Sequence, residues 1–264
     1  MSPLVVAVVA CAALAALCWL LSLLTREYSW VDRVWSLAPV GYVAWFAAQT
    51  GFADPRLVLM TILAAMWGAR LTYNFARKGG YASGGEDYRW AVLRGMMPPA
   101  LFQAFNLLFI AAYQNALLLL ISLPAWAALR ETPAPLGALD LIATAAFVLL
   151  LVGETVADQQ QWDFQQAKRR APATGPGFVT TGLFRFSRHP NFFCEQGQWW
   201  CFYLFSIAAG AGEINPSLVG PVLLTLLFLG STRFTESISA ARYPAYSDYQ
   251  RRTSRLIPWP PGRA

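Results

Sequence analysis

Histidine is almost absent from this chain of 264 residues, because His189 is its only example. Cysteine is also scarce: Cys11 and Cys18 lie in one apolar segment, and Cys194 and Cys201 lie in another. Neither pair forms a CxxC motif, and a single histidine does not complete a Cys/His zinc site. We therefore expect no bound metal and interpret the cysteines as small apolar side chains.

Charge is the second shortage. Only 13% of the residues are charged and 56% are hydrophobic, whereas soluble domains carry about 25% charged residues. Such a chain cannot bury its apolar surface in one water-soluble core, so it needs lipid as its solvent. The net charge of +6 fits a membrane surface, and we find no nucleic-acid-binding motif, so we expect no nucleic-acid partner.

Long apolar runs are abundant, and a helix that crosses a bilayer needs about 20 such residues. We predict an all-α integral membrane protein in which one domain, residues 1–264, contains about seven transmembrane helices. The predicted spans are residues 3–24, 35–51, 56–76, 99–122, 136–157, 190–210 and 216–237. The first run is long enough to span and lacks a basic leader, so we do not interpret it as a cleaved signal peptide.

The basic residues predict the orientation of these spans. Sixteen of the 20 arginines and lysines fall on one side of the predicted membrane, whereas Arg56 and Arg130 fall on the other. Arg70 and Arg233 lie inside spans; Arg70 could reach the interface from the end of its span. Cytoplasmic loops are enriched in positive charge, so we expect a cytoplasmic C-terminus and an external N-terminus.

Polar residues follow one helical face at the ends of the fifth and sixth spans. In the fifth span they are Glu154, Asp158, Gln161, Gln165 and Lys168. In the sixth span they are Asn191, Glu195 and Gln198. Residues three or four apart share a helix face, so these faces indicate walls that contact a polar ligand. Alternatively, the polar face of the fifth span is a solvated helix end. In the seventh span, Arg233 and Glu236 lie one turn apart, and they could simply pair with each other.

The stretch GLFRFSRHPNFFCEQGQWW, residues 182–200, concentrates this charge before the sixth span. Arg185 and Arg188 could bind phosphate, and Pro190 begins a helix whose first N–H groups attract anions. His189 could donate a hydrogen bond to phosphate or ribose. The pattern favours an anionic nucleotide over a basic surface loop, although the chain has no GxGxxG or Walker motif.

The same stretch, with Asp158, Lys168 and the tail YSDYQRRTSRLIPWP (residues 246–260), resembles the steroid 5α-reductase C-terminal superfamily. Its uncharacterised bacterial membrane branch is the most similar, and sterol C14-reductases are related. The resemblance implies a helical membrane fold with NADPH bound by the C-terminal half, residues 136–264, and a substrate cavity in residues 1–135. It also implies an integral protein of a bacterial cytoplasmic membrane.

The resemblance carries residue roles with it. The positions implied for the cofactor are Asp158, Lys168, Arg185, Arg188, His189, Asn191, Glu195, Arg233, Asp248 and Tyr249. For the substrate end we select Asp32, Tyr73 and Asn106 as candidate catalytic residues. Other interpretations stay open for each: an ion pair of Asp32 with Arg33 or Arg26, an interfacial anchor at Tyr73, and helix packing at Asn106.

We therefore expect an NADPH-dependent reductase that transfers hydride to a carbon–carbon double bond of a steroid-like or other lipid from the bilayer. The motif RHPNFF also resembles membrane methyltransferases of the isoprenylcysteine type, which use S-adenosylmethionine. A non-catalytic lipid-binding membrane protein is the third hypothesis, and it predicts no nucleotide binding.

Overall fold

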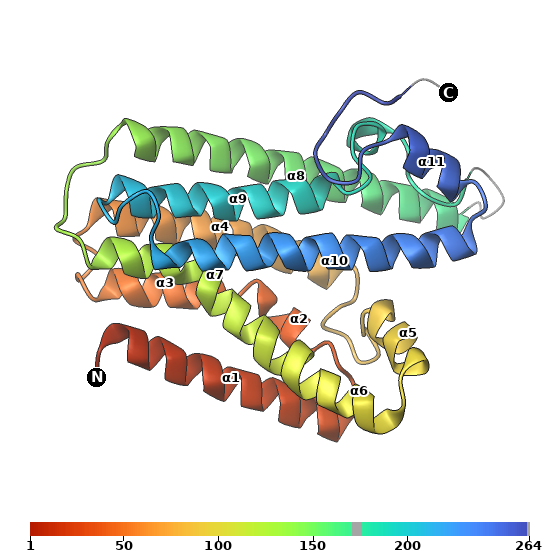
Figure 1. The fold of residues 1–264 in the computed structure, drawn as a ribbon, viewed down its shortest axis with the longest axis horizontal. Helices are drawn as coiled ribbons and strands as arrows, with labels where there is room; N and C mark the ends of the chain where they lie inside the picture. Colours follow the sequence, from red (N-terminus) through yellow and green to blue (C-terminus); the bar gives the residue numbers. More distant parts are fainter. Residues whose placement is uncertain (171–175, 263–264) are drawn as a thin grey trace. The chain divides into compact units, whose positions relative to one another are not determined.

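The structure is a computed structural model that describes residues 1–170 and 176–262 (Figure 1). Within these residues the regular secondary structure is helical, apart from one isolated bridge between Ser187 and Ser254. The all-helical fold class predicted from the sequence is therefore confirmed for the described part of the chain.

The helices follow the predicted apolar runs closely. In chain order they are α1 (Pro3–Thr25), α2 (Trp30–Trp35), α3 (Ala38–Ala48), α4 (Pro55–Arg77), α5 (Tyr88–Met96), α6 (Pro99–Phe105), the π-helix η1 (Asn106–Tyr113), α7 (Gln114–Leu129), α8 (Ala138–Arg170), the 3-10 helix η2 (Gly182–Arg185), α9 (Pro190–Ala208), the 3-10 helix η3 (Pro216–Leu218), α10 (Val219–Arg242) and α11 (Tyr246–Arg252).

Four helical segments within the described residues are long and apolar enough to cross a membrane. They are Pro3–Thr25, Pro99–Leu129, Ala138–Arg170 and Pro216–Arg242. The other three predicted spans coincide with α3, α4 and α9, and their crossing of a membrane stays a prediction. The structure thus supports an integral membrane protein and leaves the count of seven untested.

Contacts divide the chain into two compact units. Unit 1 comprises Met1–Thr144 and Phe202–Leu223, and unit 2 comprises Ala145–Cys201 and Leu224–Ala264. The helices α8, α9 and α10 each contribute residues to both units. The functional division at residues 135/136 that the sequence suggested stays a prediction.

Unit 1 has α3 packed against both α4 and α7, with Phe46 and Trp67 fully buried. Gly68 of α4 permits this packing, because a Cβ at its position would lie 2.7 Å from Cγ2 of Val40 on α3 and 2.6 Å from the carbonyl oxygen of Ser36 just before it. A buried ion pair between Arg56 and Asp140 joins the first turns of α4 and α8. Helix packing and this buried ion pair therefore both stabilise the core of unit 1.

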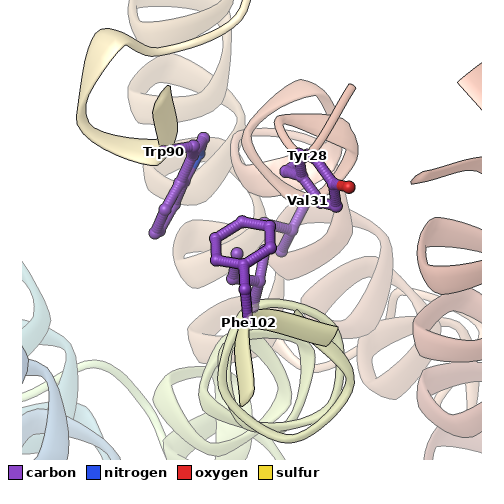
Figure 2. Packing of buried hydrophobic residues seen from close by; sticks show 5 residues of the cluster. Tyr28, Val31, Trp90 and Phe102 are labelled. Carbon is purple, nitrogen blue, oxygen red and sulfur yellow. The ribbon is translucent and has the colours of Figure 1, made fainter. Parts of the chain in front are cut away.

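A second hydrophobic cluster in unit 1 contains Tyr28, Val31, Trp90, Phe102 and Ile110. Figure 2 shows Phe102 facing Tyr28 and Val31, with Trp90 beside them. The rings of Tyr28 and Phe102 meet edge to face, with centroids 4.8 Å apart, a favourable aromatic geometry. This cluster therefore joins α2, α5, α6 and η1.

Unit 2 has a small core of Ala157, Val179 and Phe184, against which Phe164 and Leu183 pack. Gly182 allows the chain to enter this core: its φ is +63°, and a Cβ there would lie 2.4 Å from Oε1 of Gln160. That same oxygen accepts a hydrogen bond from the backbone N–H of Leu183 at 2.9 Å. The loop that precedes α9 is thereby fixed against α8.

Candidate functional site

The two polar helix faces predicted from the sequence meet inside unit 2. Gln198 of α9 donates from Nε2 to Oε2 of Glu154 on α8 at 2.7 Å. Toward the start of α9, Asn191 lies with its Nδ2 3.5 Å from Oδ1 of Asp158. Glu154 and Asp158 are 2% and 4% exposed, so both carboxylates are withdrawn from solvent and face amides. The two helices therefore run antiparallel along a buried polar seam.

A buried carboxylate organises the first residues of α9. Arg188 donates from Nε to Oε1 of Glu236 at 2.6 Å and from Nη2 to Oε2 at 3.0 Å. Nε2 of His189 lies 3.1 Å from the same Oε1, and Gln250 donates to Oε2 at 3.0 Å. Nε of Arg255 lies 3.6 Å from Oε2. Glu236 thus collects groups from the α9 start, from α11 and from the tail, and we call this set the Glu236 network.

The remaining donors of Arg188 bind the backbone of the C-terminal region. Its Nη1 donates to the carbonyl oxygen of Gln250 at 2.9 Å and also to that of Thr253. The backbone N–H groups of Arg188 and His189 donate to the carbonyls of Ser254 and Arg255 at 2.8 and 3.1 Å. Arg188 is consequently occupied by protein groups, an arrangement that favours a positioning role over direct contact with phosphate.

Lys168 and Tyr249 likewise hold the chain around this region. Nζ of Lys168 donates to the carbonyl of Gly177 and to the hydroxyl of Tyr243, both at 2.7 Å. The hydroxyl of Tyr249 donates to the carbonyl of Phe184. Burial raises the pKa of the Tyr249 phenol, and the Tyr246 phenol raises it further. Both residues bind loop or tail segments, and their cofactor roles stay predictions.

Other predicted cofactor residues lie at the surface. Arg185, Arg233 and Asp248 are exposed, and Asp248 forms an exposed ion pair with Arg251 on the same helix. Glu195 is half-buried. The pair between Arg233 and Glu236 that the sequence allowed is replaced by the pair between Arg188 and Glu236. Arg233 is therefore a surface cation one turn from the Glu236 network.

At the predicted substrate end, in unit 1, Asp32 is half-buried on α2. Its Oδ2 accepts a hydrogen bond from Nε1 of Trp90 at 2.9 Å. Burial raises the pKa of the Asp32 carboxyl above its ordinary value, and the negative charge of Asp87 adds to this rise. The alternative pairing with Arg33 is not what the structure has, because Arg33 binds Glu27 at 2.6 Å. A carboxyl with a raised pKa is suited to holding a proton.

Asn106 and Tyr73 lie in different surroundings. Asn106 is fully buried at the start of η1 and donates from Nδ2 to Oγ of Ser22 at 2.8 Å, so it joins η1 to α1. This contact fits the helix-packing alternative for Asn106. Tyr73 is 66% exposed, with its ring centroid 5.4 Å from the guanidinium carbon of Arg77, as expected of an interfacial aromatic. The catalytic roles of both residues stay predictions.

Two residues gain importance that sequence reasoning did not give them. From the sequence, Glu236 was only a possible partner of Arg233 inside an apolar span, and Trp90 gave no signal that it would donate to Asp32. The position of Glu236 inside a predicted span was the signal that it needs a buried partner, because a charge within a span is costly unless it is paired. Among the described residues, no group of three or more His, Cys, Asp or Glu side chains could hold a metal ion.

The fold and these sites define an all-helical protein of the integral membrane class. Residues 18–253 match the family described as "Protein of unknown function (DUF1295)", and the chain belongs to this family. It is similar to an uncharacterized protein of Schizosaccharomyces pombe, with 38% identity over 275 residues that cover 97% of this chain and 80% of the relative. This relative is fungal, so the similarity is not confined to the bacterial branch that the sequence resemblance suggested. No solved structure matches the chain.

Proposed function

We propose that the protein is a membrane reductase that uses NADPH to reduce a carbon–carbon double bond of a steroid-like or other lipid. The observation that carries the proposal is the contact between Asp158 and Asn191 at the start of α9, beside the Glu236 network. This region combines an amide, a carboxylate and the amino end of a 19-residue helix, which is a donor and acceptor set suited to a nucleotide. The resemblance to steroid 5α-reductases points to the same residues.

The functional group of each side chain suggests its role in binding the nucleotide. Asn191, Asp158 and Glu195 would bind amide or hydroxyl groups of the nucleotide. Arg233 is exposed beside the network and would bind phosphate, because a guanidinium pairs with phosphate through two parallel hydrogen bonds. His189 and Arg188 would hold the first turn of α9 in place through Glu236. These residues fit a nicotinamide nucleotide through the donors and acceptors they present.

When bound, the nicotinamide supplies a hydride to one carbon of the double bond and is oxidised. The other carbon needs a proton, and Asp32 is the candidate in unit 1 with the clearest means to hold one, because its pKa is raised. Its hydrogen bond from Trp90 fixes the carboxyl on α2. Asp32 would then act as the acid that polarises a conjugated carbonyl or delivers the proton.

A binding measurement tests the choice of cofactor. The purified protein is titrated separately with NADPH and with S-adenosylmethionine, and each affinity is determined by equilibrium dialysis. We expect saturable NADPH binding and no specific S-adenosylmethionine binding. Binding of S-adenosylmethionine alone would replace the reductase with a methyltransferase, and binding of neither would favour a non-catalytic lipid-binding protein.

We also propose seven membrane spans, with the N-terminus outside and the C-terminus in the cytoplasm. The support is the distribution of arginine and lysine, sixteen on one side against two on the other. A reporter that is active only in the cytoplasm, fused after Ala264, should be active. A stably inserted but inactive fusion would reverse the topology.

A further inference from the structure

Three large apolar side chains are exposed near the beginning of α9. Phe186 is 40% exposed, and Ile257 and Trp259 of the tail are 65% and 69% exposed. The backbone N–H of Trp259 donates to the carbonyl of Phe186 at 2.9 Å, so these two residues are neighbours. The tail has brought apolar side chains from separate parts of the sequence to one place on the surface of unit 2.

The depth of this place follows from its contacts with α8. The candidate span Ala138–Arg170 is apolar in its first part and becomes polar from Asp158 onward. Phe184 shares a buried cluster with Ala157, and Phe164 packs against that cluster. Ala157 and Phe164 lie on the two sides of that change. The segment that leads to Phe186 is therefore level with the point where we expect α8 to leave the hydrocarbon, on the basis of this change in composition. Tryptophan and other aromatic residues are enriched at this membrane–water interface.

The charge around the apolar residues is positive. Arg185 is exposed, and its guanidinium carbon lies 6.0 Å from the ring centroid of Phe186. Arg252 is also exposed, and its carbonyl accepts from the N–H of Gly262 at 2.9 Å, which keeps it beside the tail. The nearby acid Asp248 is paired with Arg251. Exposed arginines that flank apolar side chains at an interface complement anionic lipid phosphates.

We propose that Phe186, Ile257 and Trp259, together with Arg185 and Arg252, form a patch that docks into the headgroup layer of a bilayer containing anionic phospholipid. The apolar side chains enter the interface and the two arginines bind lipid phosphate. Because the tail also supplies carbonyl partners to Arg188, docking holds the Glu236 network against the membrane surface. Arg185 then contacts a lipid phosphate and not the nucleotide phosphate that the family resemblance implies for it.

The native cysteines make a site-specific test possible, because all four are buried. An Ile257→Cys variant is labelled with the fluorophore NBD and placed in nanodiscs of phosphatidylcholine, with or without phosphatidylglycerol. A Ser247→Cys variant is the matched control, since Ser247 is exposed on α11 outside the patch. Quenching by a lipid with a nitroxide near its headgroup and quenching by aqueous iodide are measured for both.

We expect the label at position 257 to be quenched by the nitroxide lipid and protected from iodide, most strongly with phosphatidylglycerol. Adding Arg185→Glu or Arg252→Glu should weaken docking in the anionic discs by more than about fivefold per arginine, because each reversal removes a positive charge and adds a negative one. The effect should be much smaller in phosphatidylcholine. Equal iodide access at positions 257 and 247 would overturn the proposal. The proposal would also be overturned if the quenching depended neither on phosphatidylglycerol nor on the two charge reversals.

The affinity of the Arg185→Glu variant for NADPH separates the two sources of phosphate. Lost lipid quenching with unchanged NADPH affinity assigns Arg185 to lipid. Lost NADPH affinity with unchanged quenching overturns that assignment. The lipid measurement does not require NADPH, so failure of the proposed reductase function would leave its result intact.

Discussion

Each unit contains a buried ion pair between an arginine and a carboxylate, and the two pairs differ in what surrounds the acid. In unit 1, Arg56 binds both oxygens of Asp140 at 2.7 and 2.9 Å, and the N–H of Gly137 adds a local hydrogen bond. In unit 2, Glu236 receives Arg188, His189 and Gln250. The first pair joins two helix ends, whereas the second joins three separate segments of the chain at one carboxylate. A buried arginine–carboxylate pair can therefore either join two helices or gather separate segments of the chain around one carboxylate.

The largest effect should come from breaking each pair. We expect Asp140→Asn and Glu236→Gln each to destabilise the protein by about 3–5 kcal/mol, because a buried arginine loses its charge partner. Only Glu236→Gln should also weaken NADPH binding, since it releases the start of α9. Thermal unfolding and NADPH titration of the folded fraction measure the two effects. Equal loss of NADPH affinity in both variants would remove the distinction between the pairs.

Two cations in the last turn of α8, Lys168 and Arg169, offer a second comparison. Lys168 is bonded to Gly177 and Tyr243, whereas Arg169 is exposed. We expect the protein to prefer NADPH over NADH, and Arg169→Ala to reduce that preference by roughly 10- to 150-fold if it removes one bond to a charged phosphate. Lys168→Ala should chiefly lower the melting temperature. Equal affinity of the unaltered protein for both nucleotides would contradict this expectation.

A smaller effect should distinguish two carboxyl groups near α2. The raised pKa of Asp32 means that its carboxylate form destabilises the fold, so stability is lost as pH rises through the folded-state pKa. Glu27 has a lowered pKa, through the backbone N–H of Gly84 and then Arg33, so its contribution is lost as pH falls.

Melting temperatures measured across acidic and neutral pH test this contrast. Asp32→Asn should gain stability relative to the unaltered protein as pH rises, while Glu27→Gln should lose it. The same pH trend in both variants would show that one of the two assignments is wrong.

The sequence predicted helix faces better than it predicted partners. The spacing of Glu154, Asp158, Asn191 and Gln198 placed them on two faces, because helical periodicity is local. Their mutual contacts depend on how α8 and α9 pack, which spacing does not determine. The seven apolar runs coincide with helices for the same reason, while α2, α5 and α11 are too short to give a periodic signal.

Glu236 illustrates the remaining difficulty. Its neighbour by spacing is Arg233, one turn away, yet its partner is Arg188, which is 48 residues distant. A pair of charges one helical turn apart contributes only a few tenths of a kcal/mol. The buried pair with Arg188 contributes more, so it determines where the Glu236 carboxylate binds. Tyr73 illustrates a related point, because its residue type suits either a substrate contact or an interfacial anchor. Its surroundings follow from the structure, in which the residue is 66% exposed.

The most direct test of the proposed nucleotide site compares two amides on one face of α9. Asn191 contacts Asp158 at the start of the helix, and Gln198 contacts Glu154 deeper in the seam. The affinity for NADPH is measured by titration for Asn191→Ala and Gln198→Ala, with melting temperatures alongside. Asn191→Ala should weaken binding by roughly 2- to 12-fold, the loss of one neutral hydrogen bond. Gln198→Ala should lower stability and leave affinity unchanged. Unchanged affinity in Asn191→Ala would contradict the account.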